Sequence, residues 1–186
     1  MIIFFLPLDM DVSKIVAMDC EMVGTGFFGH KSELARCSIV DYYGNVLYDK
    51  FVKPEGIITD YRTPVSGIRP SHMESAVPFL TARKEILDIL QGKIVVGHAL
   101  HNDFEVLREN MEKYNIWDTS TDRTLRSIGN LEGYRRVSLK VLCERILKKN
   151  IQTSRHGHSS VEDANATIEL FKVFEKINKM SGRGTL

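Results

Sequence analysis

Two carboxylates interrupt an otherwise apolar segment near the start of the chain. The segment IVAMDCEMVG, residues 15–24, has the composition of a buried strand, yet it carries Asp19 and Glu21. Residues two apart on a strand point to the same face, so the Cβ atoms of these two should lie roughly 6–7 Å apart. Two like charges on one face require a raised pKa in one of them or a bound cation. The alternative is a strand end that reaches solvent and carries two surface acids.

Two further acids each begin the apolar stripe of an expected helix. Asp103 follows the strand-like segment KIVVGHA, and ligand sites in α/β sheets lie at such strand ends. Asp163 begins a similar stripe in the last expected helix, and a helix N-terminus favours an anion. The pattern Ser160-x-x-Asp163 leaves a second interpretation open, which is a helix-capping motif without any chemistry. The apolar residues at helical spacing after the two acids are Val106, Leu107, Met111 and Tyr114, and Leu170, Phe174 and Ile177.

Four inward-facing acids are difficult to explain as caps. Buried carboxylates need partners, and the basic residues nearby in the sequence do not fall on the same faces. Oxygen ligands suit Mg²⁺ or Mn²⁺. Four carboxylates can hold two such ions ~3.5–4 Å apart, the arrangement used for in-line attack on a phosphate. The sequence therefore predicts a site for two divalent cations, with the ligands Asp19, Glu21, Asp103 and Asp163.

A histidine close to the fourth acid could act as a base in such a site. Histidine titrates near neutrality and can accept a proton from an attacking water. His158 lies five residues before Asp163, and Gly157 gives this loop the freedom to place an imidazole beside the metals. His156 is the nearest competitor, and spacing alone does not separate the two.

The size and composition of the chain indicate one globular domain. It has 186 residues, of which 43% are hydrophobic and 26% charged, as in ordinary globular proteins. The formal charge of +1 neither favours nor excludes a nucleic-acid partner, because local patches matter more. The 3 cysteines include no CxxC pair, which indicates reduced thiols in an intracellular protein. No apolar run approaches the ~20 residues that cross a bilayer, so we expect no membrane partner.

The expected elements are strands first, followed by alternation of strands and helices. This order predicts an α/β fold with a central mixed sheet flanked by helices. Residues 54–78 are rich in proline and should form a loop with a short helix near Ser71. We divide the chain into an N-terminal tail (1–13), one domain (14–180) and a C-terminal tail (181–186). The expected strands are 15–23, 34–42, 46–53, 93–99 and 116–119, and the expected helices are 79–91, 101–114, 121–128, 138–148 and 160–179.

Beyond single residues, the ordered motifs of this chain resemble those of the DEDDh 3′–5′ exonucleases. These belong to the DnaQ-like group, so the resemblance implies an RNase H-like fold. The resemblance is greatest to the branch with interferon-stimulated, apoptosis-enhancing and nucleolar exonucleases, and it covers about residues 14–176. It rests on the segments VAMDCEMVGTG, ELARCSIV, NVLYDKFVKPE, DYRTPVSGI, VVGHALHNDF, DTSTDR, RRVSLKVL and GHSSVEDA.

The resemblance implies roles for individual residues. It gives the same four acids as metal ligands and favours His158 over His156 as the general base. It also places Met22 and Arg62 near the sugar of the terminal nucleotide, where contact with the 2′-hydroxyl would favour RNA. From the sequence alone, Met22 could equally belong to the core and Arg62 to a solvated loop. Pro64 stands where relatives tend to carry a basic residue, which removes one phosphate contact.

The implied activity is that of a 3′–5′ exoribonuclease that degrades single-stranded RNA to nucleoside 5′-monophosphates. We expect Asp19, Asp103 and Asp163 to hold one cation beside the attacking water. Asp19 and Glu21 should hold the second beside the leaving 3′-oxygen, and His158 should take the proton. Four arginines could guide the strand or form solvated faces: Arg123, Arg126, Arg135 and Arg136.

Two other functional classes stay open at this point. A 3′–5′ DNA exonuclease would share every metal ligand, and a non-catalytic RNA-binding module would release no mononucleotides. The resemblance also implies an intracellular protein of the nucleus or nucleolus and the cytoplasm, acting in antiviral defence, innate immunity or RNA turnover. No obligate protein partner is evident from the sequence.

Overall fold

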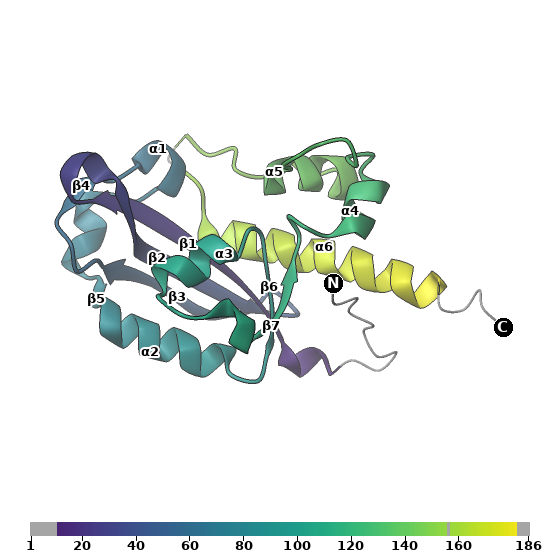
Figure 1. The fold of residues 1–186 in the computed structure, drawn as a ribbon, viewed down its shortest axis with the longest axis horizontal. Coiled ribbons are helices and arrows are strands. Elements are labelled where there is room, and N and C mark those ends of the chain that lie inside the picture. Colours follow the sequence, from purple (N-terminus) through teal and green to yellow (C-terminus); the bar gives the residue numbers. More distant parts are fainter. Residues whose placement is uncertain (1–10, 156, 182–186) are drawn as a thin grey trace.

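A mixed sheet forms the centre of the molecule in a computed structural model that describes residues 11–155 and 157–181 (Figure 1). The strand order is β5-β3-β2-β1-β6-β7, and the short β4 pairs with the far end of β1. The pairs β1–β2 and β2–β3 are antiparallel, whereas β6 and β7 run parallel to β1. The strands are β1 (Ile15–Thr25), β2 (Lys31–Asp41), β3 (Val46–Lys53), β4 (Ile58–Asp60), β5 (Val77–Pro78), β6 (Ile94–Gly97) and β7 (Asn115–Asp118).

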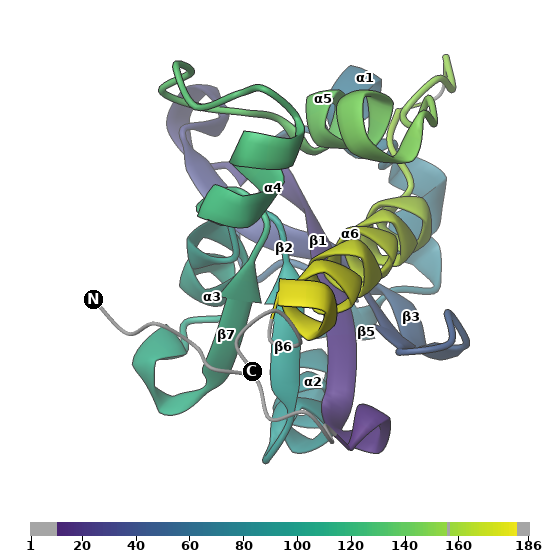
Figure 2. The same cartoon turned by 90° about the vertical axis from the view of Figure 1, so that its right-hand side faces the viewer.

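Helices cover both faces of this sheet, as the sequence predicts. Figure 2 shows α6 and α2 on opposite sides of the strands. The α-helices are α1 (Thr63–Ser66), α2 (Phe79–Leu90), α3 (His101–Val106), α4 (Arg123–Ile128), α5 (Leu139–Leu142) and α6 (Ser160–Ser181). A π-helical turn, Cys143–Leu147, extends α5, and 3₁₀ turns occupy Val12–Lys14, Phe27–Gly29, Pro70–Glu74 and Met111–Lys113.

The alternation along β1 decides what each face of the sheet carries. Ile15 and Ala17 pack in the core cluster that contains α6, whereas Val16 and Met18 pack in the cluster that contains α2 and α3. Because successive side chains alternate, residues 19 and 21 continue the face covered by α6. The strand therefore delivers its acids to the side where the last helix begins.

The short β6 leaves part of β1 uncovered at its edge. β6 pairs only with Ile15–Ala17 of β1, and β4 pairs with Gly24 and Thr25. Within the described residues, the edge of β1 between these two pairings carries no strand partner. An edge of this kind presents backbone N–H groups that other acceptors can use.

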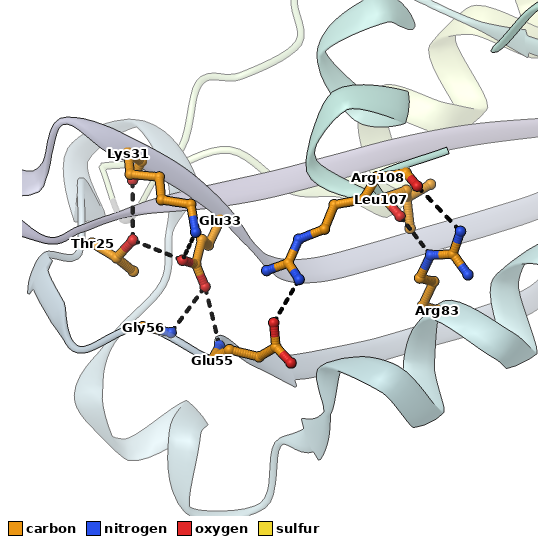
Figure 3. A network of polar contacts seen from close by, with 8 residues as sticks. All are labelled: Thr25, Lys31, Glu33, Glu55, Gly56, Arg83, Leu107 and Arg108. Atoms are coloured by element: carbon orange, nitrogen blue, oxygen red, sulfur yellow. Dashed lines mark hydrogen bonds and ion pairs between the residues drawn. The ribbon is translucent and has the colours of Figure 1, made fainter. Parts of the chain in front are cut away.

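One predicted helix is wrong in its length. The prediction of a helix over 101–114 fails because α3 ends at Val106, and Arg108 has a left-handed backbone with φ 52°. The guanidinium of Arg83 on α2 donates to the carbonyls of Leu107 (2.8 Å) and Arg108 (3.2 Å), as Figure 3 shows. These bonds satisfy carbonyls that a helix end leaves unpaired, so the tertiary contact stabilises an early end of α3.

The other predicted elements differ from the structure only in detail. The expected loop at 54–78 contains the predicted short helix near Ser71, at Pro70–Glu74, but also β4, α1 and β5. The predicted tails fall mostly on residues 1–10 and 182–186, which lie outside the described residues. None of the helices in the described ranges is both long and apolar enough to cross a membrane.

Candidate active site

Three of the four predicted acids lie together. Asp19 and Glu21 project from one face of β1, and Asp163 projects from the first turn of α6, which packs on that face. One ligand atom from each of the three lies within 4.8 Å of the others. Glu21 and Asp163 are buried, and Asp19 is partly buried. Two elements separated by more than a hundred residues thus deliver three carboxylates to one point.

Two of these carboxylates are only partly satisfied by the surrounding protein. Oε1 of Glu21 and Oδ1 of Asp163 are buried without a hydrogen-bond partner among the described residues. Burial, and then repulsion from Asp163, raise the pKa of Glu21 to about 8. Burial, followed by the charge of Asp103, raises the pKa of Asp19 well above its usual range. Burial likewise raises the pKa of Asp163.

Asp103 reaches the site from the open edge of β1. Burial raises the pKa of Asp103 to about 8, although hydrogen bonding from Cys20 acts to lower this pKa. Asp103 lines the same cleft as Asp19 but is not one of the three residues whose ligand atoms lie within 4.8 Å. Its role as a fourth metal ligand stays a prediction.

The donor set and its unsatisfied atoms fit a divalent cation. Orphaned buried carboxylate oxygens are costly in free energy unless a partner binds them. A hard cation such as Mg²⁺ or Mn²⁺ prefers oxygen ligands. It would satisfy these atoms and stabilise the charged form of carboxyls whose pKa values burial raises. Asp19, Glu21 and Asp163 are the residues that would hold it, with Asp103 beside them.

The helix-capping interpretation of Asp163 does not describe the observed contacts. Ser160 lies inside α6, and its hydroxyl bonds with the hydroxyl of Ser38 on β2 (2.6 Å). Oδ2 of Asp163 accepts from the side-chain amide of Gln152 (2.9 Å). The Asp163 carboxylate is therefore held by a side chain from the preceding loop while its other oxygen faces the acidic cluster.

His158 lies next to this cluster. Its backbone N–H donates to the carbonyl of Val65 (2.8 Å), and its Nδ1 is 3.9 Å from Oδ2 of Asp163. About a third of the side chain (33%) is exposed, which leaves room for a reacting group. His156 lies outside the described residues, so the structure makes no comparison between the two histidines.

Gly157 is explained by close packing rather than by flexibility. It has φ +97°, and a Cβ at this position would collide with the backbone of Gly67 and come within 2.6 Å of the Thr63 carbonyl. The loop before α6 thus passes in contact with the loop around α1. This contact fixes the position from which His158 projects.

A cleft of about 790 Å³ runs beside Asp19 and Asp103. Met22 and Arg62 both line it, as expected for residues near a substrate. The guanidinium of Arg62 donates to the Ser32 hydroxyl and to the Gly29 carbonyl, each at 2.8 Å. Arg62 is therefore held against the loop between β1 and β2 rather than extended into solvent.

The four candidate guide arginines lie elsewhere. None of them is among the described residues that line this cleft. Arg126 donates to the carbonyls of Tyr134 (2.7 Å) and Ser120 (2.8 Å), so it holds a loop in place. Arg123 lines a separate, shallow depression together with Arg126. These contacts give Arg126 a structural role that the sequence analysis did not predict.

The sequence reading missed two residues that contact or face the acids. Gln152 follows buried Ile151 in an irregular loop, and its spacing to Asp163 carries no recognisable signal. Arg36, which is distant from Glu21 in the sequence, lies directly opposite it on β2, so a basic residue shares the face of this acid. Arg36 lowers the pKa of Glu21, but its guanidinium is committed to Asp49 through two bonds of 2.8 and 2.9 Å.

Comparison with curated proteins identifies close relatives. The human apoptosis-enhancing nuclease is 56% identical over 163 residues, which are 88% of this chain and 50% of that protein. The mouse interferon-stimulated gene 20 kDa protein is 60% identical over 141 residues, 76% of this chain and 47% of that protein. RNA exonuclease 4 of Debaryomyces hansenii is 48% identical, over 88% of this chain and 58% of that protein. The chain spans about half the length of the curated relatives that it matches.

Solved structures with the same architecture come from Pan2 proteins. The Neurospora crassa Pan2 catalytic unit aligns with a TM-score of 0.74 and 26% identity, over 89% of this chain and 27% of that one. The Saccharomyces cerevisiae Pan2 exonuclease module in complex with AACCAA RNA aligns with a TM-score of 0.75 and 27% identity, over 91% and 30%. Residues 16–171 match the family model described as exonuclease, RNase_T. The chain therefore belongs to this exonuclease family and has its RNase H-like fold.

Proposed function

We propose that this protein is a 3′–5′ exoribonuclease of the DEDDh type, which removes nucleoside 5′-monophosphates from single-stranded RNA with two divalent cations, Mg²⁺ or Mn²⁺. The observation that carries the proposal is the meeting of Asp19, Glu21 and Asp163 within 4.8 Å, with partnerless buried oxygens on two of them. Membership of the exonuclease family supports it.

The acids in this proposal hold the cations, and the cleft holds the strand. Asp19, Glu21, Asp103 and Asp163 are the proposed ligands. Bound at such a site, divalent cations activate the attacking water and stabilise the charge on the leaving 3′-oxygen. Gln152 orients Asp163 through its 2.9 Å bond, so that one carboxylate oxygen remains directed into the cluster.

His158 is the proposed general base. Its Nδ1 lies 3.9 Å from a proposed ligand, and its ring is partly exposed, so the imidazole can meet a water that the acids position. Taking the proton from that water produces an imidazolium beside the Asp163 carboxylate, which stabilises the new positive charge. In this arrangement Asp163 stabilises the protonated base, so the proposal needs no additional carboxylate for that purpose.

The terminal nucleotide lies against Met22 and Arg62 in this proposal. Both line the cleft next to Asp19. A contact with the ribose 2′-hydroxyl at this point would favour RNA over DNA. The name RNA exonuclease 4 and the RNA complexes of yeast Pan2 support RNA as the substrate class. We extend the proposal to an intracellular role in RNA turnover or antiviral defence, in the nucleus or nucleolus and the cytoplasm, on the names of the relatives.

A time course on single strands labelled at the 5′ end tests the proposal. With Mn²⁺, an RNA oligonucleotide should shorten one nucleotide at a time from its 3′ end, and a DNA of the same sequence should shorten more slowly. EDTA should stop both reactions. The matched variants are Asp163→Asn, which should be inactive, and Asp88→Asn, a surface acid 62% exposed, which should behave as wild type. Faster digestion of DNA than of RNA would indicate a DNA exonuclease instead. Release of the 5′ label without products of intermediate length would refute degradation from the 3′ end.

A further inference from the structure

Two phenylalanines are almost fully exposed on the turn between β1 and β2. Phe27 is 79% exposed and Phe28 is 84% exposed. Their rings contact each other edge to face, with centroids 4.3 Å apart, so each ring keeps a face open to solvent. We refer to this pair as the aromatic tip. Exposed rings of this kind carry a free-energy cost that a binding partner would remove.

The aromatic tip is held in a defined conformation. Phe28 has a left-handed backbone with φ 52°, which is unfavourable for a residue with a bulky side chain. Gly26 and Gly29 on either side have φ of +70° and +66°. The Thr59 hydroxyl donates to the Gly26 carbonyl (2.7 Å), and Arg62 donates to the Gly29 carbonyl (2.8 Å). Bonds from two neighbouring segments thus maintain a turn that presents both rings outward.

The aromatic tip directly precedes residues that line the candidate active-site cleft. The three residues that follow the turn, His30, Lys31 and Ser32, all line that cleft. Arg62, which also lines it, bonds to both Ser32 and Gly29. Thr25, the last residue of β1 before the turn, is six positions after Asp19, which corresponds to roughly 20 Å along an extended strand. An RNA strand bound in the cleft with its 3′ end at Asp19 would reach the aromatic tip after about six stacked nucleotides, or after fewer nucleotides if the RNA is extended.

We infer that the aromatic tip stacks on bases of the single strand upstream of the nucleotide being removed. The inference rests on the proposed function and adds a second contact region to it. Bases stack on aromatic rings regardless of sequence, which suits an enzyme that must move along a strand. Two rings at the mouth of a cleft also match single bases better than they match a broad apolar partner. Arg62 then acts as a positioning residue, because it holds the turn that carries the rings.

Binding of a single strand in EDTA measures this contact apart from any chemistry. The probe is an RNA of about 12 nucleotides that carries the fluorescent base 2-aminopurine at one position, moved along the strand from one probe to the next. In the wild type, fluorescence should be quenched at positions up to about six nucleotides from the 3′ end. The double variant Phe27→Ala/Phe28→Ala should lose this quenching and bind about tenfold or more weakly.

Three matched variants decide the chemical nature of the contact. Tyr43→Ala removes a ring that is 71% exposed at the opposite end of β2, and it should bind as the wild type does. The double variant with tyrosine at 27 and 28 should retain quenching, whereas the double variant with leucine should lose it. Full affinity in the leucine variant would overturn stacking, because apolar side chains without a ring would then be sufficient for the contact.

A dinucleotide separates failure of this inference from failure of the proposed function. It is too short to reach the aromatic tip, so its cleavage with Mn²⁺ should be unchanged in the alanine double variant. Wild-type affinity and quenching in that variant would overturn the inference, whatever the rate on the dinucleotide. Absence of cleavage by the wild type would overturn the proposed function, while the binding measurement in EDTA would still decide the role of the tip.

Discussion

Buried carboxylates occur at two places in the molecule, and their environments differ. In the acidic cluster, Glu21 and Asp163 keep buried oxygens that have no partner among the described residues. On β2, Glu33 accepts four hydrogen bonds, as Figure 3 shows. The donors are the hydroxyl of Thr25 (3.0 Å), the ammonium of Lys31 (2.7 Å) and the backbone N–H groups of Glu55 and Gly56 (3.0 Å each).

The two sites differ in their supply of donors. Burial would raise the pKa of Glu33, but the bonds from Lys31, Gly56 and Thr25 outweigh it and lower the pKa to about 2. Burial, and then repulsion from Asp163, raise the pKa of Glu21 to about 8, and no comparable set of donors among the described residues opposes them. A saturated carboxylate is a structural element, whereas an unsaturated cluster is available to a cation. Four predictions test this distinction.

Removing one acid from the unsaturated cluster should have the largest effect. Asp163→Asn should lower the cleavage rate on the order of 10⁴-fold, about 5.5 kcal/mol of transition-state stabilisation. It should leave thermal stability in EDTA unchanged or raised, because it removes a repelling charge. Mn²⁺ should raise the melting temperature of the wild type and of Asp88→Asn but not of Asp163→Asn. An equal Mn²⁺ shift in all three proteins would contradict the assignment of Asp163 as a ligand.

Removing the proposed base should affect the rate without affecting the cations. His158→Ala should lower the rate by ~10²–10⁴, the usual range for a positioned base. Its melting temperature should still rise with Mn²⁺ as in the wild type. A variant with the full rate and an unchanged pH–rate profile would show that another group takes the proton.

Releasing Asp163 from its positioning partner should have an intermediate effect. Gln152→Ala removes the 2.9 Å bond to Oδ2 of Asp163. It should raise the Mn²⁺ concentration needed for half-maximal rate by ~10–100-fold, as is usual when a residue that orients a metal ligand is removed. Excess Mn²⁺ should restore most of the rate. The control is the exposed residue Gln91, whose replacement by alanine should change nothing. Loss of rate that excess Mn²⁺ leaves unrestored would argue for a different role.

Changing the saturated carboxylate should affect stability and leave the chemistry almost intact. Glu33→Gln should reduce the free energy of unfolding at pH 7 by ~1–3 kcal/mol, because donors to a buried charge lose their acceptor. Cleavage of a dinucleotide should change by less than about twofold, since Glu33 makes no bond to the acidic cluster. Urea unfolding at pH 7 measures the stability difference.

The pH dependence of that difference has a definite sign. The folded pKa of Glu33, about 2, lies below its ordinary value of 4.5. The stabilisation is therefore present above about pH 4.5 and is lost as the pH falls toward 2. The deficit of Glu33→Gln should shrink over this interval. A constant deficit between pH 7 and pH 3 would show that shape rather than charge stabilises the network.

Much of the active site could be predicted from periodicity. The alternation of β1 is local, so it correctly places Asp19 and Glu21 on one face. The apolar stripe of α6 is equally local and brings Asp163 to the same side of the sheet. The mixed sheet with helices on both faces follows from the order of the elements and is confirmed. In each case, the information lies within one element.

The features that the sequence reading missed depend on contacts between elements. The early end of α3 depends on Arg83, a residue on another helix. The position of Arg36 opposite Glu21 depends on the register of β1 and β2, which shifts immediately after Glu21 because Ala35 is an extra residue on β2. The saturation of Glu33 depends on backbone N–H groups more than twenty residues away. None of these relations follows from spacing along the chain.

The contact between Gly157 and Gly67 has a consequence for the order of events during turnover. The same loop that carries Arg62 provides, through the carbonyl of Val65, the anchor for His158. The proposed base and the side chain proposed to face the sugar therefore share one support. In the proposed mechanism, an RNA end that displaced this support would also displace the imidazole, so binding of the terminal sugar and proton transfer would be coupled.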